Sequence, residues 1–140
     1  MEAIMQKLIK ISLVMNIVVL IPITTALLMD AHWVQKGYGD FTPARGILLS
    51  IYLAILVASI LLFLKRNPNL VATLLFVQIV YKFTTPFTVG TIMNPVVISN
   101  LFIAAFHAVT LYYIWKSGSL NENRNPVNTL KKNPRFYRHS

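Results

Sequence analysis

The sequence contains no cysteine, and this absence removes several kinds of chemistry at once. A chain without thiols forms no disulfide bond and offers no thiolate ligand to zinc or to an iron–sulfur cluster. A cysteine nucleophile is excluded for the same reason. Any function must therefore come from other side chains, or from surfaces that the chain presents to other molecules.

Acidic residues are scarce as well, with 4 Asp and Glu against 13 Lys and Arg. The long apolar segments described below hold no carboxylate and a single histidine, His107. General acid–base catalysis in a buried site usually pairs two titratable groups, and bis-histidine haem ligation needs a second histidine. We therefore expect that the chain is not an enzyme, that it has no catalytic residue, and that it binds no metal or cofactor.

Apolar residues are abundant, at 56% of the chain, whereas only 12% of residues are charged. Most of them fall in four segments: residues 11–29, 47–64, 70–81 with a weaker extension past Lys82, and 96–115. Each segment approaches the roughly 20 residues that cross a hydrocarbon core of about 30 Å. The sequence predicts an all-α membrane protein, with four transmembrane helices that form two antiparallel hairpins in one bundle over residues 1–115.

The placement of the basic residues predicts how the chain crosses the membrane. Only Lys36, Arg45 and Lys82 lie on one side of the predicted spans, and all other basic residues lie on the opposite side. The positive-inside rule then places both termini in the cytoplasm, in a cell or inner membrane. The first span is expected to be an uncleaved anchor. This distribution, rather than the net charge of +9, argues for a lipid bilayer as partner and against nucleic acid.

Proline and a capping side chain mark the start of three spans. Thr42, Asn67 and Asn94 each stand directly before a proline, which favours the first position of a helix. Only residues 65–69 join the second and third spans, so these two are expected to be neighbours.

Small residues recur every four positions on two spans. These residues are Ser50, Ala54 and Ala58 on the second span, and Asn100, Ala104 and Ala108 on the fourth. Such faces allow close approach of helices in lipid. They predict either packing between the second and fourth spans or a docking face for another subunit.

Several polar residues inside the spans form a candidate intramembrane polar layer. Its members are Asn16, Tyr52, Gln78, Lys82, Asn100 and His107. Asn16, Gln78 and His107 each lie about 12 Å from the cytoplasmic end of their spans, at about 1.5 Å per residue. The layer is expected either to satisfy itself through interhelical hydrogen bonds or to give His107 a role in binding or proton transfer.

Lys82 is the one charged residue within an apolar run. If the third span ends near Thr85, ahead of Pro86, the lysine can snorkel to the outer interface. Otherwise it needs a buried counter-charge, for which Asp30 and Asp40 are the outer carboxylates. A broken helix beside a lysine is also typical of transporter sites.

The segment between the first two spans contains Gly-Tyr-Gly-Asp at residues 37–40, which resembles the end of a potassium-channel selectivity filter. The preceding Gln35 and Lys36 depart from that pattern, and no pore helix of sufficient length precedes them. A turn-rich loop is the expected structure. Its aromatic residues are expected to anchor at the membrane interface: Trp33, Tyr38 and Phe41.

Residues 116–140 form a basic, turn-rich segment that we expect to be a cytoplasmic tail. Six basic residues follow Trp115, and such a tail is attracted to anionic lipid by about 1 kcal/mol per basic residue. Its candidate partner or lipid contacts are Lys131, Lys132, Arg135, Phe136, Tyr137 and Arg138.

Together these features predict a small non-catalytic membrane subunit of a larger membrane protein complex, which docks through helix faces and the basic tail. The alternative is a small homo-oligomeric transporter or ion channel with a polar path through the bundle.

Overall fold

The computed structural model describes residues 1–118 and is entirely helical over that range, apart from short connections. Four helices are long and apolar enough to cross a membrane. In chain order the elements are α1 (Glu2–Leu28), α2 (His32–Tyr38), α3 (Pro43–Leu64), α4 (Pro68–Val89) and α5 (Pro95–Lys116). The predicted tail contacts Lys131, Lys132, Arg135, Phe136, Tyr137 and Arg138 lie outside the described residues.

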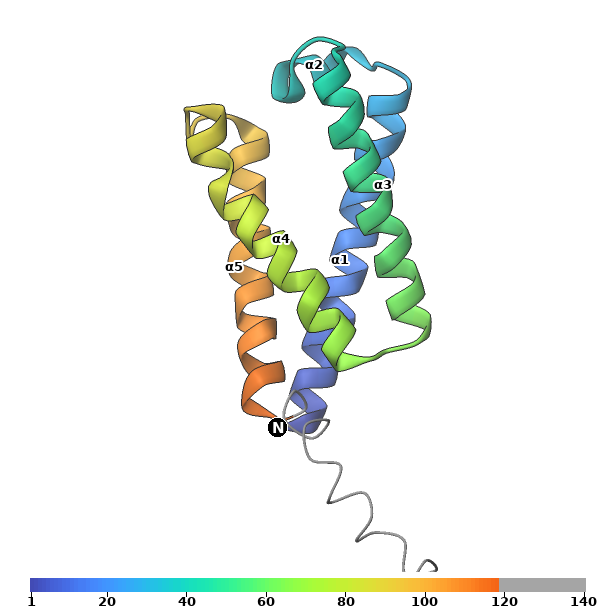
Figure 1. The fold of residues 1–140 in the computed structure, drawn as a ribbon, viewed down its shortest axis with the longest axis vertical. Coiled ribbons are helices and arrows are strands. Elements are labelled where there is room, and N and C mark those ends of the chain that lie inside the picture. The colour runs from blue at the N-terminus through green and yellow to red at the C-terminus, as the bar shows by residue number, and fades with distance from the viewer. Residues whose placement is uncertain (119–140) are drawn as a thin grey trace, which may run out of the picture.

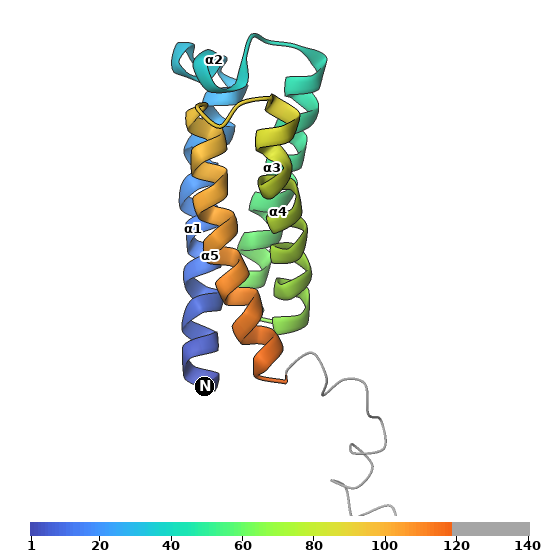
Figure 2. The same cartoon turned by 90° about the vertical axis from the view of Figure 1, so that its left-hand side faces the viewer.

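The four long helices are arranged as two closely packed pairs (Figures 1 and 2). Helix α1 packs along α3, α4 packs along α5, and contacts between α1 and α5 join the pairs. The pairs lie close together near the N-terminus and diverge towards the end that carries α2 (Figure 1). We call these the closed end and the α2 end of the bundle.

The predicted starts of three helices are confirmed. The side chains of Thr42, Asn67 and Asn94 accept backbone N–H groups of the first turn at 2.8–3.4 Å, and a proline follows each of them. Each cap satisfies amides that lack a partner inside the helix. Local sequence therefore determines where α3, α4 and α5 begin.

The prediction for the first helix was too short, because α1 begins at Glu2 rather than near residue 11. Met5 and Ile9 are fully buried, while Lys7 and Lys10 are exposed. The charged residues thus lie on one side of an added helical stretch, and the apolar residues pack into the closed end from the other. An apolar-run criterion misses such an amphipathic extension.

Helix α4 does not stop before its proline, contrary to the prediction of a break there. It continues through Pro86 to Val89 and ends at Gly90, which has a left-handed backbone conformation. A proline inside a helix leaves the carbonyl four residues earlier without its usual donor. Here that carbonyl belongs to Lys82, and the Thr85 hydroxyl donates to it at 2.6 Å.

The segment predicted to be a turn-rich loop contains helix α2. The Tyr38 ring packs edge-on against Tyr52 of α3, with centroids 6.1 Å apart, so it points into the protein rather than towards the membrane interface. Trp33 is 56% exposed, and Phe41 is exposed beneath the Arg45 guanidinium, 5.5 Å from its ring centroid. Only these two aromatics keep the exposure that interfacial anchoring requires.

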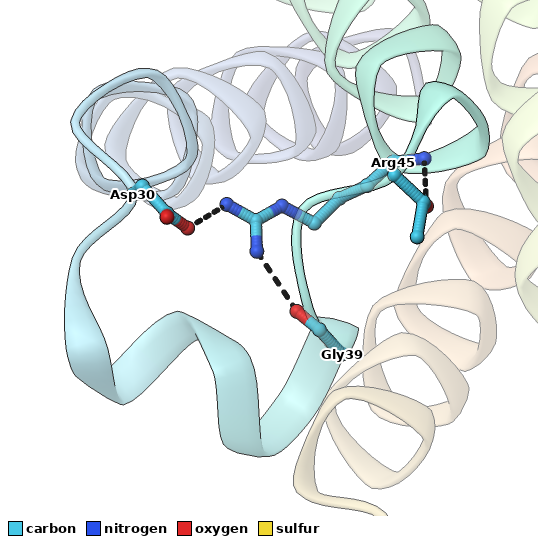
Figure 3. Close-up of polar contacts among 4 residues, drawn as sticks. Asp30, Gly39 and Arg45 are labelled. Carbon is cyan, nitrogen blue, oxygen red and sulfur yellow. Dashed lines mark hydrogen bonds and ion pairs between the residues drawn. The ribbon is translucent and has the colours of Figure 1, made fainter.

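Arg45 holds the α2 segment against the first helix pair (Figure 3). Its side chain is buried near the start of α3, and its guanidinium forms an ion pair with Asp30 just after α1. The same group donates to the Gly39 carbonyl, at the end of α2, at 2.8 Å. One arginine therefore connects the ends of three helices. Its partner Asp30 is one of the two carboxylates that the sequence suggested as a counter-charge for Lys82.

A second set of contacts fastens α2 to the other helix pair. The Asn94 side chain donates from Nδ2 to the Gly37 carbonyl at 3.0 Å, and Val96 lies directly against Gly37. A Cβ atom at position 37 would lie 2.7 Å from Val96 Cγ2. Helix α2 therefore bridges the two pairs where they diverge, and the bridge needs glycine at this position.

Apolar side chains fill each end of the bundle differently. The closed end contains a cluster from α1, α4 and α5 made of Met5, Ile9, Leu13, Val71, Ala72, Leu75 and Ile114. A second cluster joins α1 and α3 to α2 and consists of Leu20, Ala26, Leu27, Val34, Tyr52 and Ile55. No fully buried member of the second cluster comes from α4 or α5, although Leu74 and Tyr81 of α4 pack against its edge.

The predicted packing of α3 against α5 through small residues is wrong. Helices α3 and α5 are not among the pairs that pack together, because α1 contacts both of them. Ser50 and Ala54 of α3 are exposed, as is Ala108 of α5, while Asn100 and Ala104 are buried. Ser50 and Ala54 of the small-residue face of α3 are therefore left uncovered, while Ala58 is partly buried.

Substitution of Gly37 by Ala should weaken the attachment of α2 and lower the free energy of unfolding by about 1–3 kcal/mol, as overpacking does. The β-branched Val96 side chain has little freedom to move away. Gly46→Ala is the matched control, since a Cβ atom added there would meet no neighbour within 4 Å, and it should be neutral or stabilising. Thermal unfolding in detergent measures the stability of both variants. Combining Gly37→Ala with Val96→Ala should recover the stability that Gly37→Ala alone loses. Equal changes in stability for Gly37→Ala and Gly46→Ala would contradict the close contact between Gly37 and Val96.

Candidate functional site

Asn16 of α1 is the centre of a buried hydrogen-bonded chain. Its Nδ2 donates to Ser59 Oγ of α3 at 3.1 Å, and its Oδ1 lies 3.0 Å from His107 Nε2 of α5. Because an amide oxygen only accepts, His107 carries its proton on Nε2 in this arrangement. Asn16 thus links three helices through the two ends of one amide.

A second polar pair lies about one turn closer to the closed end. Ser12 Oγ and Thr110 Oγ1 are 2.8 Å apart, and both residues are fully buried. The Thr110 hydroxyl also donates to the Phe106 carbonyl, so Ser12 supplies the proton between the two. Sequence reasoning missed this pair. The available signal was helical spacing, since Ser12 precedes Asn16 by four residues and Thr110 follows His107 by three.

Gln78 is placed differently from Asn16 and His107, although all three were expected at one depth. It is 1% exposed, and its Nε2 has no hydrogen-bond partner in the part of the chain that the structure describes. His107 Nδ1 is likewise unpaired there. The six candidate residues therefore do not share one network. Asn16 and His107 belong to the network near the closed end, and Lys82 and Asn100 form a separate pair.

Lys82 donates from Nζ to Asn100 Oδ1 at 3.1 Å, and its Nζ lies 4.9 Å from the Tyr81 ring centroid. The lysine is only 4% exposed, so it does not snorkel to the interface. It has no ion pair either, because the one salt bridge within residues 1–118 joins Arg45 to Asp30. Both alternatives drawn from the sequence are thus wrong: the ammonium is buried beside an amide and an aromatic ring.

Lys82 and Asn100 line a cavity of about 320 Å³ beneath α2. All five helices contribute to its wall, and α2 covers it with Trp33, Lys36, Gly37 and Tyr38. The other lining residues are Val19, Leu20 and Ile23 of α1, Tyr52 of α3, and Pro95, Val96, Ser99 and Ile103 of α5. The cavity occupies the space that the divergence of the two helix pairs creates.

The charged side chains that line this cavity are all positive. Its lining includes two lysines and no carboxylate, and burial raises the pKa of Tyr38, so that this phenol stays neutral. Asn100 Nδ2 has no hydrogen-bond partner within the described chain. Over the same residues no three His, Asp or Glu side chains are grouped in a way that could hold a metal ion. The site therefore offers donors and positive charge to whatever enters it.

Asn16 and Gln78 should contribute differently to the stability of the bundle. Asn16→Leu removes both bonds to Ser59 and His107 and should cost about 1 kcal/mol, given about 0.6 kcal/mol per interhelical bond in membranes. Gln78→Leu is the matched control: its Nε2 gains no bond in the native state, so the cost should be near zero. Reversible unfolding in mixed micelles measures both. An equal loss for the two variants would show that Gln78 has a partner in solution.

Comparison of the chain with protein-family models, with curated proteins and with solved structures found no match. A functional conclusion therefore depends on the geometry of the chain's own residues.

Proposed function

We propose that this chain is a small non-catalytic integral-membrane subunit of a larger membrane protein complex. The observation that supports the proposal best is the uncovered face of α3. Ser50, Ala54 and Ala58 repeat at four-residue spacing on that face, and Ser50 and Ala54 are exposed. Small residues at this spacing allow the backbone of a second helix to approach closely within a bilayer.

Burial within the bundle supports the same proposal. Helix α3 has the highest mean hydropathy of the four long helices, 2.9, yet it buries the smallest share of its length. Only four of its residues are buried: Arg45, Tyr52, Ile55 and Ser59. A helix that buries so little of its surface within its own bundle has most of that surface free for contact with another protein.

The topology that belongs to this proposal has four spans in two antiparallel hairpins, with both termini in the cytoplasm. Residues 116–140 then form a basic tail on the same side as the Lys65 loop, where anionic lipid and acidic groups of a partner are available. The tail and the α3 face would contact the same complex. The α2 end of the bundle would face the opposite side of the membrane.

Cysteine labelling tests the orientation directly, since the natural chain has no cysteine. A cysteine at Ser117 should be protected from a membrane-impermeant thiol reagent in intact cells, because it follows α5 on the cytoplasmic side. A cysteine at Gln35 in α2 should be labelled. Permeabilised cells provide the control, in which both positions should react. The reverse pattern in intact cells would overturn the orientation.

The docking face is tested by a bulky substitution that leaves the bundle itself intact. Ala54→Phe should reduce recovery of companion subunits at least tenfold, because it fills the surface that the partner helix approaches. Ala105→Phe on α5 is the matched control, since Ala105 is also an exposed alanine within a span. Purification in mild detergent and mass spectrometry at equal expression measure recovery. Identical companions with both variants, or none with the natural chain, would contradict the subunit proposal.

A transporter or channel is the second candidate, and a specific observation favours it. Five polar residues of the bundle are buried without forming one hydrogen-bonded network: Lys82, Asn100, Gln78, His107 and Asn16. Gln78 precedes Lys82 by one helical turn, so a polar path from the cavity would pass along this face of α4. The apolar cluster at the closed end then blocks the path. In an alternating-access scheme this arrangement would be an outward-open state. Homo-oligomers in native mass spectrometry, without other subunits, would place this candidate first.

A further inference from the structure

The geometry points to a binding site in the cavity beneath α2 for a single-chain amphiphile with a carboxylate head, held by Lys82 and Asn100. This inference goes beyond the proposed subunit role and does not depend on the α3 face. It starts from the buried lysine. An ammonium taken out of water without a counter-charge is unfavourable, and the residues that surround Lys82 supply an amide oxygen and an aromatic ring but no carboxylate.

The hydrogen-bonding groups around Lys82 are unbalanced towards donors. A lysine ammonium has three donor hydrogens, and one of them is directed to Asn100 Oδ1. With its oxygen engaged, Asn100 presents its Nδ2 group, which is buried beside the Tyr52 side chain and makes no hydrogen bond within residues 1–118. A carboxylate is the complementary ligand, because it accepts several hydrogen bonds, donates none, and carries the single negative charge that one ammonium neutralises.

The rest of the lining suits an apolar body. Val19 and Ile23 of α1 line the cavity together with Val96 and Ile103 of α5. These residues belong to two helices that are long and apolar enough to cross a membrane, so the apolar part of the lining lies at the depth of a hydrocarbon chain. Lys36 of α2, an exposed residue of the lining, adds a second positive charge.

The size of the cavity restricts the ligand further. At about 320 Å³ it lies at the lower end of the range for small-molecule pockets. A single acyl chain can enter such a space beside its head group, whereas a phospholipid with two chains would have to leave most of its body outside. A cation is excluded by the two lysines. The chemistry and the volume together favour a fatty-acid-like monocarboxylate.

Tryptophan fluorescence provides a direct measure of occupancy. The chain has two tryptophans, and Trp33 lines the cavity while Trp115 lies near the end of α5. In a Trp115→Phe background, reconstituted in phosphatidylcholine nanodiscs at pH 8, dibromostearic acid should quench Trp33 saturably. Its methyl ester, which has the same chain and no charge, should quench only to the level expected from partition into the bilayer.

Three substitutions in that background separate binding from partition. Lys82→Met keeps the length of the side chain and removes its charge, and it should raise the half-saturating concentration of dibromostearic acid at least tenfold. Lys10→Met is the matched control, because Lys10 is an exposed lysine of α1 near the closed end, and it should change nothing. Asn100→Asp places a carboxylate beside Lys82. It should abolish saturable quenching and raise the midpoint of thermal unfolding in the absence of ligand.

The same measurements can overturn the inference. Equal quenching by the acid and the methyl ester, or an unchanged half-saturating concentration in Lys82→Met, would show that the ammonium binds no carboxylate. If dibrominated phosphatidylglycerol quenches Trp33 at lower concentration than the fatty acid, the anion belongs to a phospholipid head group and the single-chain assignment is wrong. If Lys82→Met does not fold, the result for Asn100→Asp decides, since persistence of saturable quenching there would refute the site.

Discussion

The pairing of polar groups inside long apolar helices is the constraint on which the structure depends. A buried polar group in such a helix is costly unless it finds a partner within the protein, and a helix satisfies its own backbone groups. The details of this chain follow from that requirement. Caps at Thr42, Asn67 and Asn94 satisfy helix starts, and Thr85 supplies a donor to the carbonyl that Pro86 leaves unpaired. Helix α4 thereby continues where its sequence predicts a stop.

The same constraint explains the division of the bundle into two ends. Near the closed end, Asn16 connects α1, α3 and α5, and the Ser12 and Thr110 hydroxyls add a second link between α1 and α5. At the other end the bridge between the pairs is α2, which Arg45 and Asp30 hold on one side and Asn94 holds on the other. The space under that bridge becomes the cavity.

The part of the fold that depends on neighbouring residues could be predicted from the sequence. The part that depends on contacts between helices could not. The four long apolar helices and the three capped helix starts follow from composition and from neighbouring residues. The equal depth of Asn16 and His107 along their helices predicted that the two side chains lie close together, and they are in contact. Arg45 looks like an ordinary residue outside the second apolar span, yet it is buried because Asp30 and Gly39 meet it from other helices. Small residues on α3 and α5 suggested mutual packing, but the position of α1 between these helices is a property of the whole bundle.

The balance of donors and acceptors distinguishes polar residues that hold a membrane bundle together from those available to a ligand. Asn16 has both ends of its amide engaged, so its polarity is used by the fold. Lys82 and Asn100 share one hydrogen bond, and N–H donors of both side chains remain unused within the described residues. The cavity beside them is lined by no carboxylate that could accept these donors. Gln78 Nε2 is also unpaired within residues 1–118, but Gln78 does not line that cavity. A buried polar group therefore indicates a site only when its unused hydrogen-bonding capacity and an accessible space occur at the same place.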